Sequence, residues 1–309
     1  MTTHYDAIID KCRDLPPVRT AIVHPVKPNV MEAVADAVAE NLIVPILIGP
    51  QARILAAARE AGVDISGWNL MNAEHSHEAA AKAASLAAAG QADAIMKGSL
   101  HSDELLGAIV KSNSGLRTER RISHAFLMSI PSYPKPFIIT DAAINIDPDL
   151  AVKADITQNA VNLWHVVFGD QALPKVAVLA AVETVNPKMQ ATLDAAALCK
   201  MSDRGQITGA QVDGPLAFDN AISPAAVKEK GIISLVAGDA DILLVPEIES
   251  GNMLAKQLIF LGGADAAGIV LGARVPIMLT SRADGLRTRR LSCALAVLLA
   301  EARKVGRLK

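Results

Sequence analysis

The sequence predicts an α/β protein whose parallel strands are covered by helices and whose chain forms two lobes. Hydrophobic residues make up 51% of its 309 residues but aromatic residues only 3%, so the core is built from Ala, Val, Leu and Ile. Such a composition is typical of strands buried on both faces. Strand and helix patterns also alternate along the chain, and its length exceeds what one compact core comfortably holds.

The first series of elements begins as a strand–helix–strand unit. Residues 21–25 predict a strand, 30–41 an amphipathic helix, and 44–49 a second strand that ends before Pro50. Further elements of the same kind follow, namely helices at 52–61, 76–89 and 101–112 and a strand at 94–96. This alternation predicts a parallel, doubly wound sheet.

A proline-rich segment interrupts this alternation. Residues 134–141, with Asp147-Pro148 just beyond, place three prolines around one strand, so we expect the chain to cross between lobes there. A second series follows, with helices at 148–168, 189–201 and 251–261, a stretch at 207–216, strands at 176–180, 242–246, 267–271 and 276–280, and a helix from about 284 to 304. Because the last helix is expected to return, we predict one lobe from 1–140 plus 285–309 and another from 141–284.

Composition and charge exclude several classes of partner. The balance of 30 Lys and Arg against 32 Asp and Glu gives a net charge of −2, which offers no basic surface for nucleic acid. The N-terminus lacks an export signal, and the longest apolar stretches are shorter than the ~18 residues of a membrane helix. Three widely spaced cysteines form no disulfide framework. We therefore expect a soluble cytoplasmic protein with no nucleic-acid or membrane partner.

Common cofactor motifs are missing from the sequence. It contains no GxGxxG after the first strand, no GxxxxGK[ST] and no GxSxG, so dinucleotide, P-loop and hydrolase sites lack their usual signatures. His75 and His77 are two residues apart, which places them on different faces of a helix. We therefore expect no metal site.

The most informative polar segment follows the strand at 276–280. Ser281, Arg282 and Asp284 stand between this strand and the last helix, and ligands of open α/β sheets bind at the carboxyl ends of strands. An Arg fork and helix N-terminal amides both recognise phosphate. An equally open alternative is that Ser281 or Asp284 caps the helix while Arg282 is solvated.

Three more polar segments allow both a functional and a structural interpretation. Lys97-Gly98-Ser99 joins a strand to a helix and suits an anion site, although Ser99 could instead be the N-cap. Arg120-Arg121 precedes an apolar run, and an arginine cluster in this position is often a solvated turn before a strand. Asp213-Gly214-Pro215 is equally compatible with a structural Asx-turn.

The combination and order of these segments resemble the phosphate acetyltransferase and phosphate butyryltransferase family over roughly residues 20 to 300. The resemblance rests on Met96-Lys97-Gly98, Arg120-Arg121-Ile122-Ser123-His124, Asp213-Gly214-Pro215-Leu216, Val236-Ala237-Gly238-Asp239-Ala240-Asp241, Ser250-Gly251-Asn252 and Thr280-Ser281-Arg282-Ala283-Asp284. It implies a two-lobed, three-layer α/β/α fold of the isocitrate/isopropylmalate dehydrogenase type. It also implies a homodimer with the active site in the cleft between the lobes.

The same resemblance implies a reaction and roles for residues. The reaction is the reversible transfer of a short acyl group between coenzyme A and inorganic phosphate through a ternary complex, with CoA as substrate and no permanently bound cofactor or metal. Ser281, Arg282 and Arg121 match catalytic residues of the family. Acetyltransferases of the family place a catalytic aspartate where this chain has Thr288, so Asp284 is our candidate base. The implied substrate-binding residues are Lys97, Gly98, Ser99, His124, Asp213 and Asn252.

Two other functions stay open at this level. A decarboxylating NAD-dependent dehydrogenase of the same fold would need an acidic metal cluster and a nicotinamide site, and the sequence offers no convincing version of either. A non-catalytic regulator that binds CoA or acyl phosphate would keep the fold without turnover. Activity with CoA separates these functions from acyl transfer.

Overall fold

The computed structural model describes residues 4–279 and 285–308 and divides into two compact units. Unit 1 contains the described residues up to Arg120 and from Ala267 onward, and unit 2 runs from Arg121 to Ala266. The sequence placed these boundaries after residues 140 and 284. The first lies earlier because β5 (Ser123–Ser129) pairs antiparallel with β6 (Phe137–Thr140), so the proline-rich segment contains the end of a hairpin connection and β6 itself, all inside unit 2. The second lies earlier because β10 (Asp265–Leu271) pairs with β11 (Ile277–Met278).

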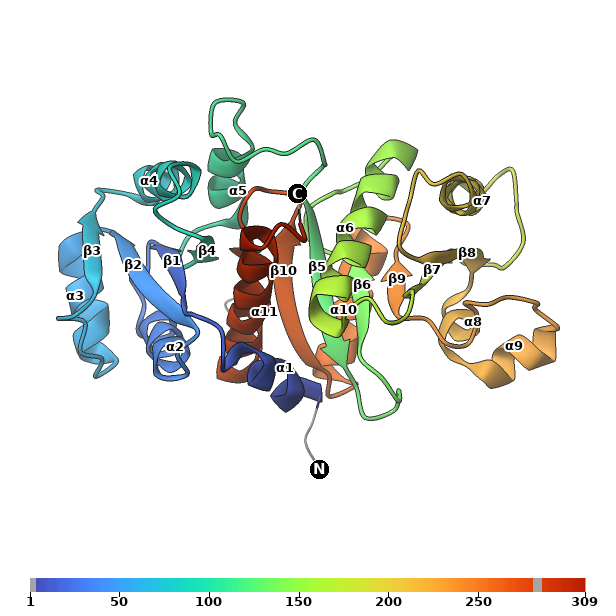
Figure 1. Ribbon diagram of the computed structural model, residues 1–309, viewed down its shortest axis with the longest axis horizontal. Coiled ribbons are helices and arrows are strands. Elements are labelled where there is room, and N and C mark those ends of the chain that lie inside the picture. Colours follow the sequence, from blue (N-terminus) through green and yellow to red (C-terminus); the bar gives the residue numbers. More distant parts are fainter. Residues whose placement is uncertain (1–3, 280–284, 309) are drawn as a thin grey trace. The chain divides into compact units, whose positions relative to one another are not determined.

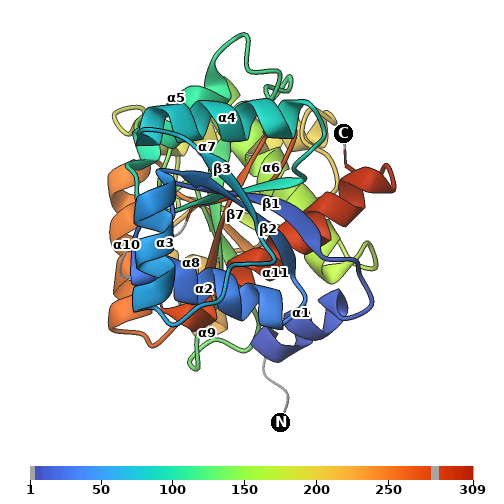
Figure 2. The ribbon, with the colours of Figure 1, turned by 90° about the vertical axis from the view of Figure 1, so that its left-hand side faces the viewer.

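Unit 1 contains a mixed sheet in the strand order β3-β2-β1-β4-β11-β10, in which β10 runs antiparallel to β11 and the other pairs are parallel. After α1 (His4–Cys12), its first eight elements are β1 (Val18–Val23), α2 (Pro28–Ala39), β2 (Ile43–Gly49), α3 (Gln51–Glu60), β3 (Asn69–Asn72), α4 (Ser76–Ala88), β4 (Ala94–Lys97) and α5 (Ser102–Val110). Helices α2 and α3 cover one face of these strands, and α4 and α5 lie on the other (Figure 2). Because β2 and β4 lie on opposite sides of β1, the strand order reverses between β1 and β4.

Packing in unit 1 follows from small aliphatic residues. Helix α4 buries a stripe of alanines against β1 and β2, at Ala79, Ala80, Ala83, Ala84 and Ala87. Short side chains let the helix axis approach the sheet closely. The C-terminal helix α11 (Leu286–Lys304) packs beside α1 (His4–Cys12), and the two lie together in Figure 1. The terminal helix thus belongs to unit 1, as the sequence predicts.

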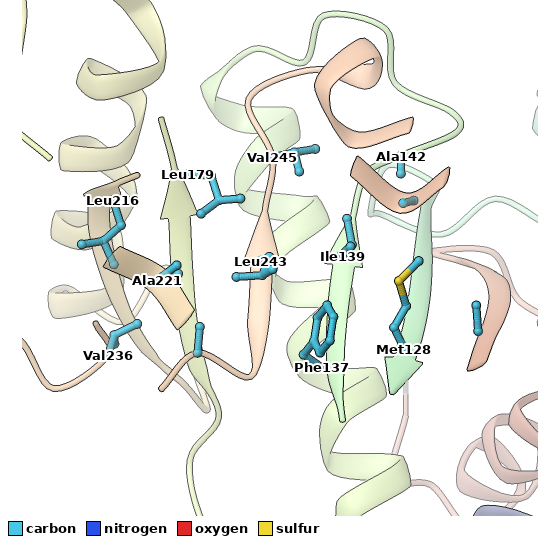
Figure 3. Close-up of a cluster of buried hydrophobic side chains, with 14 residues drawn as sticks. Met128, Phe137, Ile139, Ala142, Leu179, Leu216, Ala221, Val236, Leu243 and Val245 are labelled. Atoms are coloured by element: carbon cyan, nitrogen blue, oxygen red, sulfur yellow. The ribbon is translucent and has the colours of Figure 1, made fainter. Parts of the chain in front are cut away.

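Unit 2 contains the strand order β5-β6-β9-β7-β8, parallel except for β5. Its remaining elements are α6 (Leu150–Phe168), β7 (Lys175–Leu179), α7 (Gln190–Asp203), β8 (Gln211–Leu216), α8 (Phe218–Ile222), α9 (Pro224–Lys230), β9 (Ile242–Leu244) and α10 (Ile248–Phe260). The core of this unit is drawn in Figure 3, where Phe137 is the ring among labelled side chains that are otherwise aliphatic or methionine. An aliphatic core is therefore confirmed for unit 2.

The strand directions differ from the purely parallel arrangement that the sequence predicts. Two pairs, β5 with β6 and β10 with β11, are antiparallel, since each pair is joined by a short connection rather than by a helix. The prediction from the sequence also lacks β3, an edge strand with asparagine at each end and partly exposed side chains. None of the helices described combines the length and the apolar character needed to cross a membrane.

Candidate functional site

The predicted site residues fall into three groups. Lys97, Gly98 and Ser99 lie in unit 1, and Arg121, His124, Asp213 and Asn252 lie in unit 2. Ser281, Arg282 and Asp284 lie outside the described residues. The helix that follows them, α11, begins at Leu286.

The Lys97-Gly98-Ser99 segment lies at the carboxyl end of β4, beside β1, where the strand order of unit 1 reverses. Ligands of open α/β sheets bind at such a reversal. Lys97 is buried, with 8% of its surface exposed, and its Nζ donates a hydrogen bond to the carbonyl oxygen of Leu100 at 3.2 Å. A buried ammonium group is thereby held at the edge where a ligand is expected.

Glycine is required at position 98 by the close approach of the chain after β1. A Cβ there would lie 2.3 Å from the carbonyl oxygen of Val23, which already accepts a hydrogen bond from the Gly98 N–H at 2.9 Å. The N–H of Ser99 donates to the carbonyl of His24, also at 2.9 Å. The Ser99 Oγ is buried with no hydrogen-bond partner among the described residues. The segment thus offers an unused hydroxyl beside a buried cation.

His24 is a neighbour of this segment that the sequence analysis did not select. Its Nδ1 donates to the carbonyl of Ser99 at 3.1 Å, and burial lowers the pKa of its imidazole despite that hydrogen bond. Burial thus favours the neutral ring, and in that form the proton lies on Nδ1, because a carbonyl can only accept. The residue has a φ of 54°, which is uncommon outside glycine. The sequence could have indicated this residue, because the histidine stands at the end of the first predicted strand, directly before Pro25.

Arg121 is held through its backbone while its side chain is exposed. Its N–H donates to Asp155 Oδ2 at 2.9 Å, and its carbonyl accepts from Asn159 Nδ2 at 2.9 Å. Both partners lie on α6, so this helix fixes the chain just before β5. The guanidinium Nε donates to Asn145 Oδ1 at 3.4 Å. The charged group is thus oriented by one further residue.

A buried turn after β6 carries Asn145. Asp141 is 2% exposed and accepts hydrogen bonds from the N–H groups of Ala143, Ile144 and Asn145 and from Asn145 Nδ2, at 3.0, 3.1, 3.2 and 2.6 Å. Burial raises the pKa of Asp141, and these donors oppose the shift. Neither Asp141 nor Asn145 is among the site residues predicted from the sequence, although a carboxylate directly after a buried strand can indicate a functional site.

The Ser250-Gly251-Asn252 block brings the start of α10 against the same turn. Asn252 Nδ2 donates to the carbonyl of Ala142 at 3.1 Å. A Cβ at position 251 would lie 2.9 Å from the carbonyl oxygen of Asp141. The turn after β6 therefore links two predicted site residues, because it contacts Asn252 on α10 and Arg121 before β5.

His124 and Asp213 are not part of this cluster. His124 is 1% exposed, its ring packs edge-on against Phe126 with the centroids 4.4 Å apart, and burial lowers its pKa to about 4. Asp213 lies in the edge strand β8, where its Oδ1 accepts from the Gly214 N–H at 2.8 Å. The strands β7 and β9 separate β8 from β6. The described contacts of both residues are therefore internal to the fold of unit 2.

No group of three or more His, Cys, Asp or Glu side chains is placed to hold a metal ion within residues 4–279 and 285–308.

Comparisons with known proteins agree on one family. The chain matches the family model described as phosphate acetyl/butaryl transferase over residues 75–297. It is 58% identical over 293 residues to the phosphate acetyltransferase of Rickettsia prowazekii, and the matched region covers 95% of this chain and 83% of the relative. A branched-chain phosphotransacylase structure from Enterococcus faecalis is 31% identical, with a TM-score of 0.79 over 92% of this chain and 99% of that one.

A more distant structure shares the fold alone. A 4-hydroxythreonine-4-phosphate dehydrogenase from Klebsiella pneumoniae is 13% identical, with a TM-score of 0.55 over 92% of this chain and 99% of that one. The dehydrogenase-like α/β fold expected from the sequence is thereby confirmed. The segment matched by the family model contains every predicted site residue from Lys97 to Asp284. The chain therefore belongs to the phosphate acetyl/butyryl transferase family.

Proposed function

We propose that this protein is an acyltransferase that interconverts acyl-CoA plus inorganic phosphate with acyl phosphate plus CoA. The observation that carries the proposal is the 58% identity, over 95% of the chain, to a phosphate acetyltransferase. CoA serves as a substrate, and no permanently bound cofactor takes part. The two substrates react in a ternary complex, where proximity and orientation lower the barrier.

The chemistry demands cationic groups beside the reacting phosphate. Attack of the CoA thiolate on the carbonyl of acyl phosphate creates an oxyanion, and the departing phosphate carries about two negative charges. In our proposal Arg121 and Arg282 hold the phosphoryl oxygens, and Ser281 donates a hydrogen bond to the oxyanion. Asp284 orients or deprotonates the thiol, although a carboxylate of pKa about 4 is a weak base for a thiol of pKa about 8.5.

The described groups divide between substrate contact and support. Lys97, Ser99 and Asn252 are proposed to contact substrate, since a buried ammonium group and an unpartnered hydroxyl suit an anionic ligand. Gly98 lets the chain after β1 approach closely. The internal hydrogen bond of Asp213 supports a structural role for this residue. The His124 ring packs against Phe126, but its buried Nδ1 has no hydrogen-bond partner among the described residues, so His124 remains a proposed substrate-binding residue.

A homodimer in the cytoplasm is the proposed setting. Several large apolar side chains of unit 2 are strongly exposed in the single chain, among them Ile233, Leu235, Phe260 and Leu261 at 101, 75, 67 and 84%. Burial of such side chains against a second copy of the chain would remove apolar surface from water. Light scattering after gel filtration is expected to give twice the mass of the 32.4 kDa chain.

Acetyl transfer is the proposed principal activity, because the 58% identical relative is an acetyltransferase. A panel of acetyl-, propionyl- and butyryl-CoA, each with inorganic phosphate, is expected to give the highest kcat/KM for acetyl-CoA. A preference for butyryl-CoA would reassign the acyl group and leave the reaction class unchanged.

The test of the reaction itself follows release of the CoA thiol and formation of acyl phosphate. Arg282→Ala is expected to lower turnover by at least ~10², because it removes a donor to the transition state. Arg59→Ala is the matched control, since the described hydrogen bond of Arg59 is to Leu55 within α3. Absence of CoA-dependent turnover in the wild type, or more than half of wild-type activity in Arg282→Ala with intact circular dichroism, would contradict the proposal.

Oxidation of a substrate with NAD and Mg²⁺ is not expected, because a shared fold does not imply a shared activity. NAD reduction by the wild type would favour the dehydrogenase alternative. Saturable CoA binding without turnover would favour the regulatory one.

A further inference from the structure

The orientation of the Asn145 amide is determined by its neighbours. Its Nδ2 lies 2.6 Å from Asp141 Oδ2 and 2.9 Å from the carbonyl oxygen of Ile122, and both of these atoms can only accept hydrogen bonds from it. The amide nitrogen therefore faces Asp141 and Ile122. The amide oxygen is left facing Arg121, whose Nε lies 3.4 Å away.

The base of this arrangement is buried and fully hydrogen-bonded. Asn145 is 7% exposed, and its own N–H also donates to Asp141. The four hydrogen bonds that Asp141 accepts match the capacity of an ionised carboxylate. Asp141 is thereby satisfied by donors other than Arg121, and Asn145 stands between this buried carboxyl group and the exposed guanidinium.

The nature of this link matters for an arginine that binds an anion. An amide oxygen accepts a hydrogen bond without carrying a net charge, so it orients the guanidinium and leaves its positive charge available. A carboxylate in the same place would form an ion pair with Arg121 and compete with phosphate. Asn145 engages Nε, and no described residue forms a hydrogen bond or ion pair with the two terminal nitrogens of Arg121, so these nitrogens can act as a fork for phosphoryl oxygens.

We propose that Asn145 is a positioning residue that aims the terminal fork of Arg121 at the phosphoryl group of the substrate without neutralising its charge. This inference rests on the proposed function, in which Arg121 binds that group. The turn Asp141–Asn145 is then the support of the phosphate site in unit 2.

Kinetics with acetyl-CoA and inorganic phosphate test the inference in four proteins: wild type, Asn145→Ala, Arg121→Ala and the double variant. Asn145→Ala is expected to raise the KM for phosphate by about 3- to 10-fold, the effect of losing one ordinary hydrogen bond. The KM for acetyl-CoA should change less than about two-fold on the same reasoning. In the Arg121→Ala background, Asn145→Ala should cause no further rise, because its target is gone.

A second substitution separates positioning from simple hydrogen bonding. Asn145→Asp keeps an acceptor at the same place but adds a charge, so it should raise the KM for phosphate more than Asn145→Ala does. Equal or better phosphate binding by Asn145→Asp would overturn the inference. If Asn145→Ala does not fold, Asn145→Ser keeps a small polar side chain that cannot reach Arg121, and the same rise is expected from it.

The controls keep the two proposals apart. Asn162→Ala is the matched variant, because Asn162 accepts its hydrogen bond from Gln158 within α6 and none of its described contacts is to Arg121. It should leave the KM for phosphate unchanged. Absence of turnover by the wild type would contradict the proposed function. Normal wild-type turnover with additive effects of Asn145→Ala and Arg121→Ala, or with an effect of Arg121→Ala and none of Asn145→Ala, would overturn the positioning role alone.

Discussion

Gly251 lies against the backbone of Asp141: a Cβ at position 251 would be 2.9 Å from the Asp141 carbonyl oxygen and 2.7 Å from Val245 Cγ2. The start of α10 can therefore reach the turn after β6 only with glycine at this position. That contact places Asn252 within hydrogen-bond distance of Ala142. The glycine of the Ser-Gly-Asn block thus determines how α10 meets the turn that carries Asn145.

Substitution of this glycine should cost stability through overpacking. Gly251→Ala is expected to lower the free energy of unfolding by about 1–3 kcal/mol, because the neighbours include backbone that cannot move freely. Urea denaturation measures the change. Gly107→Ala is the matched control, since no atom lies within 4 Å of its added Cβ and glycine disfavours the interior of α5. It should raise stability by about 0.5–1 kcal/mol, and equal effects of the two variants would contradict the contact.

His124 should make stability depend on pH. Burial lowers its pKa from 6.5 to about 4, so between these values the unfolded chain binds a proton that the folded chain does not. Stability contributed by the neutral ring is fully present above about pH 6.5 and is lost as the pH falls toward about 4, by roughly 3 kcal/mol in total. Denaturation of His124→Asn across this range should show a flatter pH dependence than the wild type.

The comparison is between His124→Asn and the wild type, unfolded in the same series of buffers. An identical slope in His124→Asn and the wild type would mean that His124 does not stay neutral in the fold.

The buried ion pair between α6 and α7 should respond asymmetrically to substitution. Lys153 Nζ lies 2.6 Å from Asp194 Oδ2, and both residues are more than nine-tenths buried. Lys153→Met should destabilise the fold by about 3–5 kcal/mol, because Asp194 loses its countercharge. The double variant Lys153→Met with Asp194→Leu should recover most of that loss in chemical denaturation. A double variant no more stable than Lys153→Met would show that the pair contributes net stability.

Asp284 should shape the pH dependence of turnover if it assists the CoA thiol. Asp284→Asn is expected to slow the reaction that consumes CoA and to move its pH optimum toward alkaline values, where the thiolate forms unaided. Initial rates from acetyl phosphate and CoA across pH 6 to 9 measure both effects. An unchanged profile with normal rates would contradict a role of Asp284 at the thiol.

Local patterns accounted for much of the fold and for the family. The alternation of aliphatic runs with Ala-rich helices was sufficient to predict β1, β2, β4 and the helices between them, since such periodicity is written in neighbouring residues. The order of the Lys-Gly, Arg-Arg, Asp-Gly-Pro, Ser-Gly-Asn and Ser-Arg blocks pointed to the family that the comparisons show. By contrast, β3 was missed because asparagine at both ends of an edge strand gives no strand signal.

The sequence by itself determined the α/β class, the aliphatic core and the set of polar segments that could bind an anion. Only the tertiary structure decided that β5 runs antiparallel to β6, that His124 is buried, and that Asn145 lies between Asp141 and Arg121. The physical reason is the distance along the chain between the residues that interact. Periodicity and turn chemistry act between residues a few positions apart, whereas burial and hydrogen-bond partners depend on segments that meet only after the chain has folded.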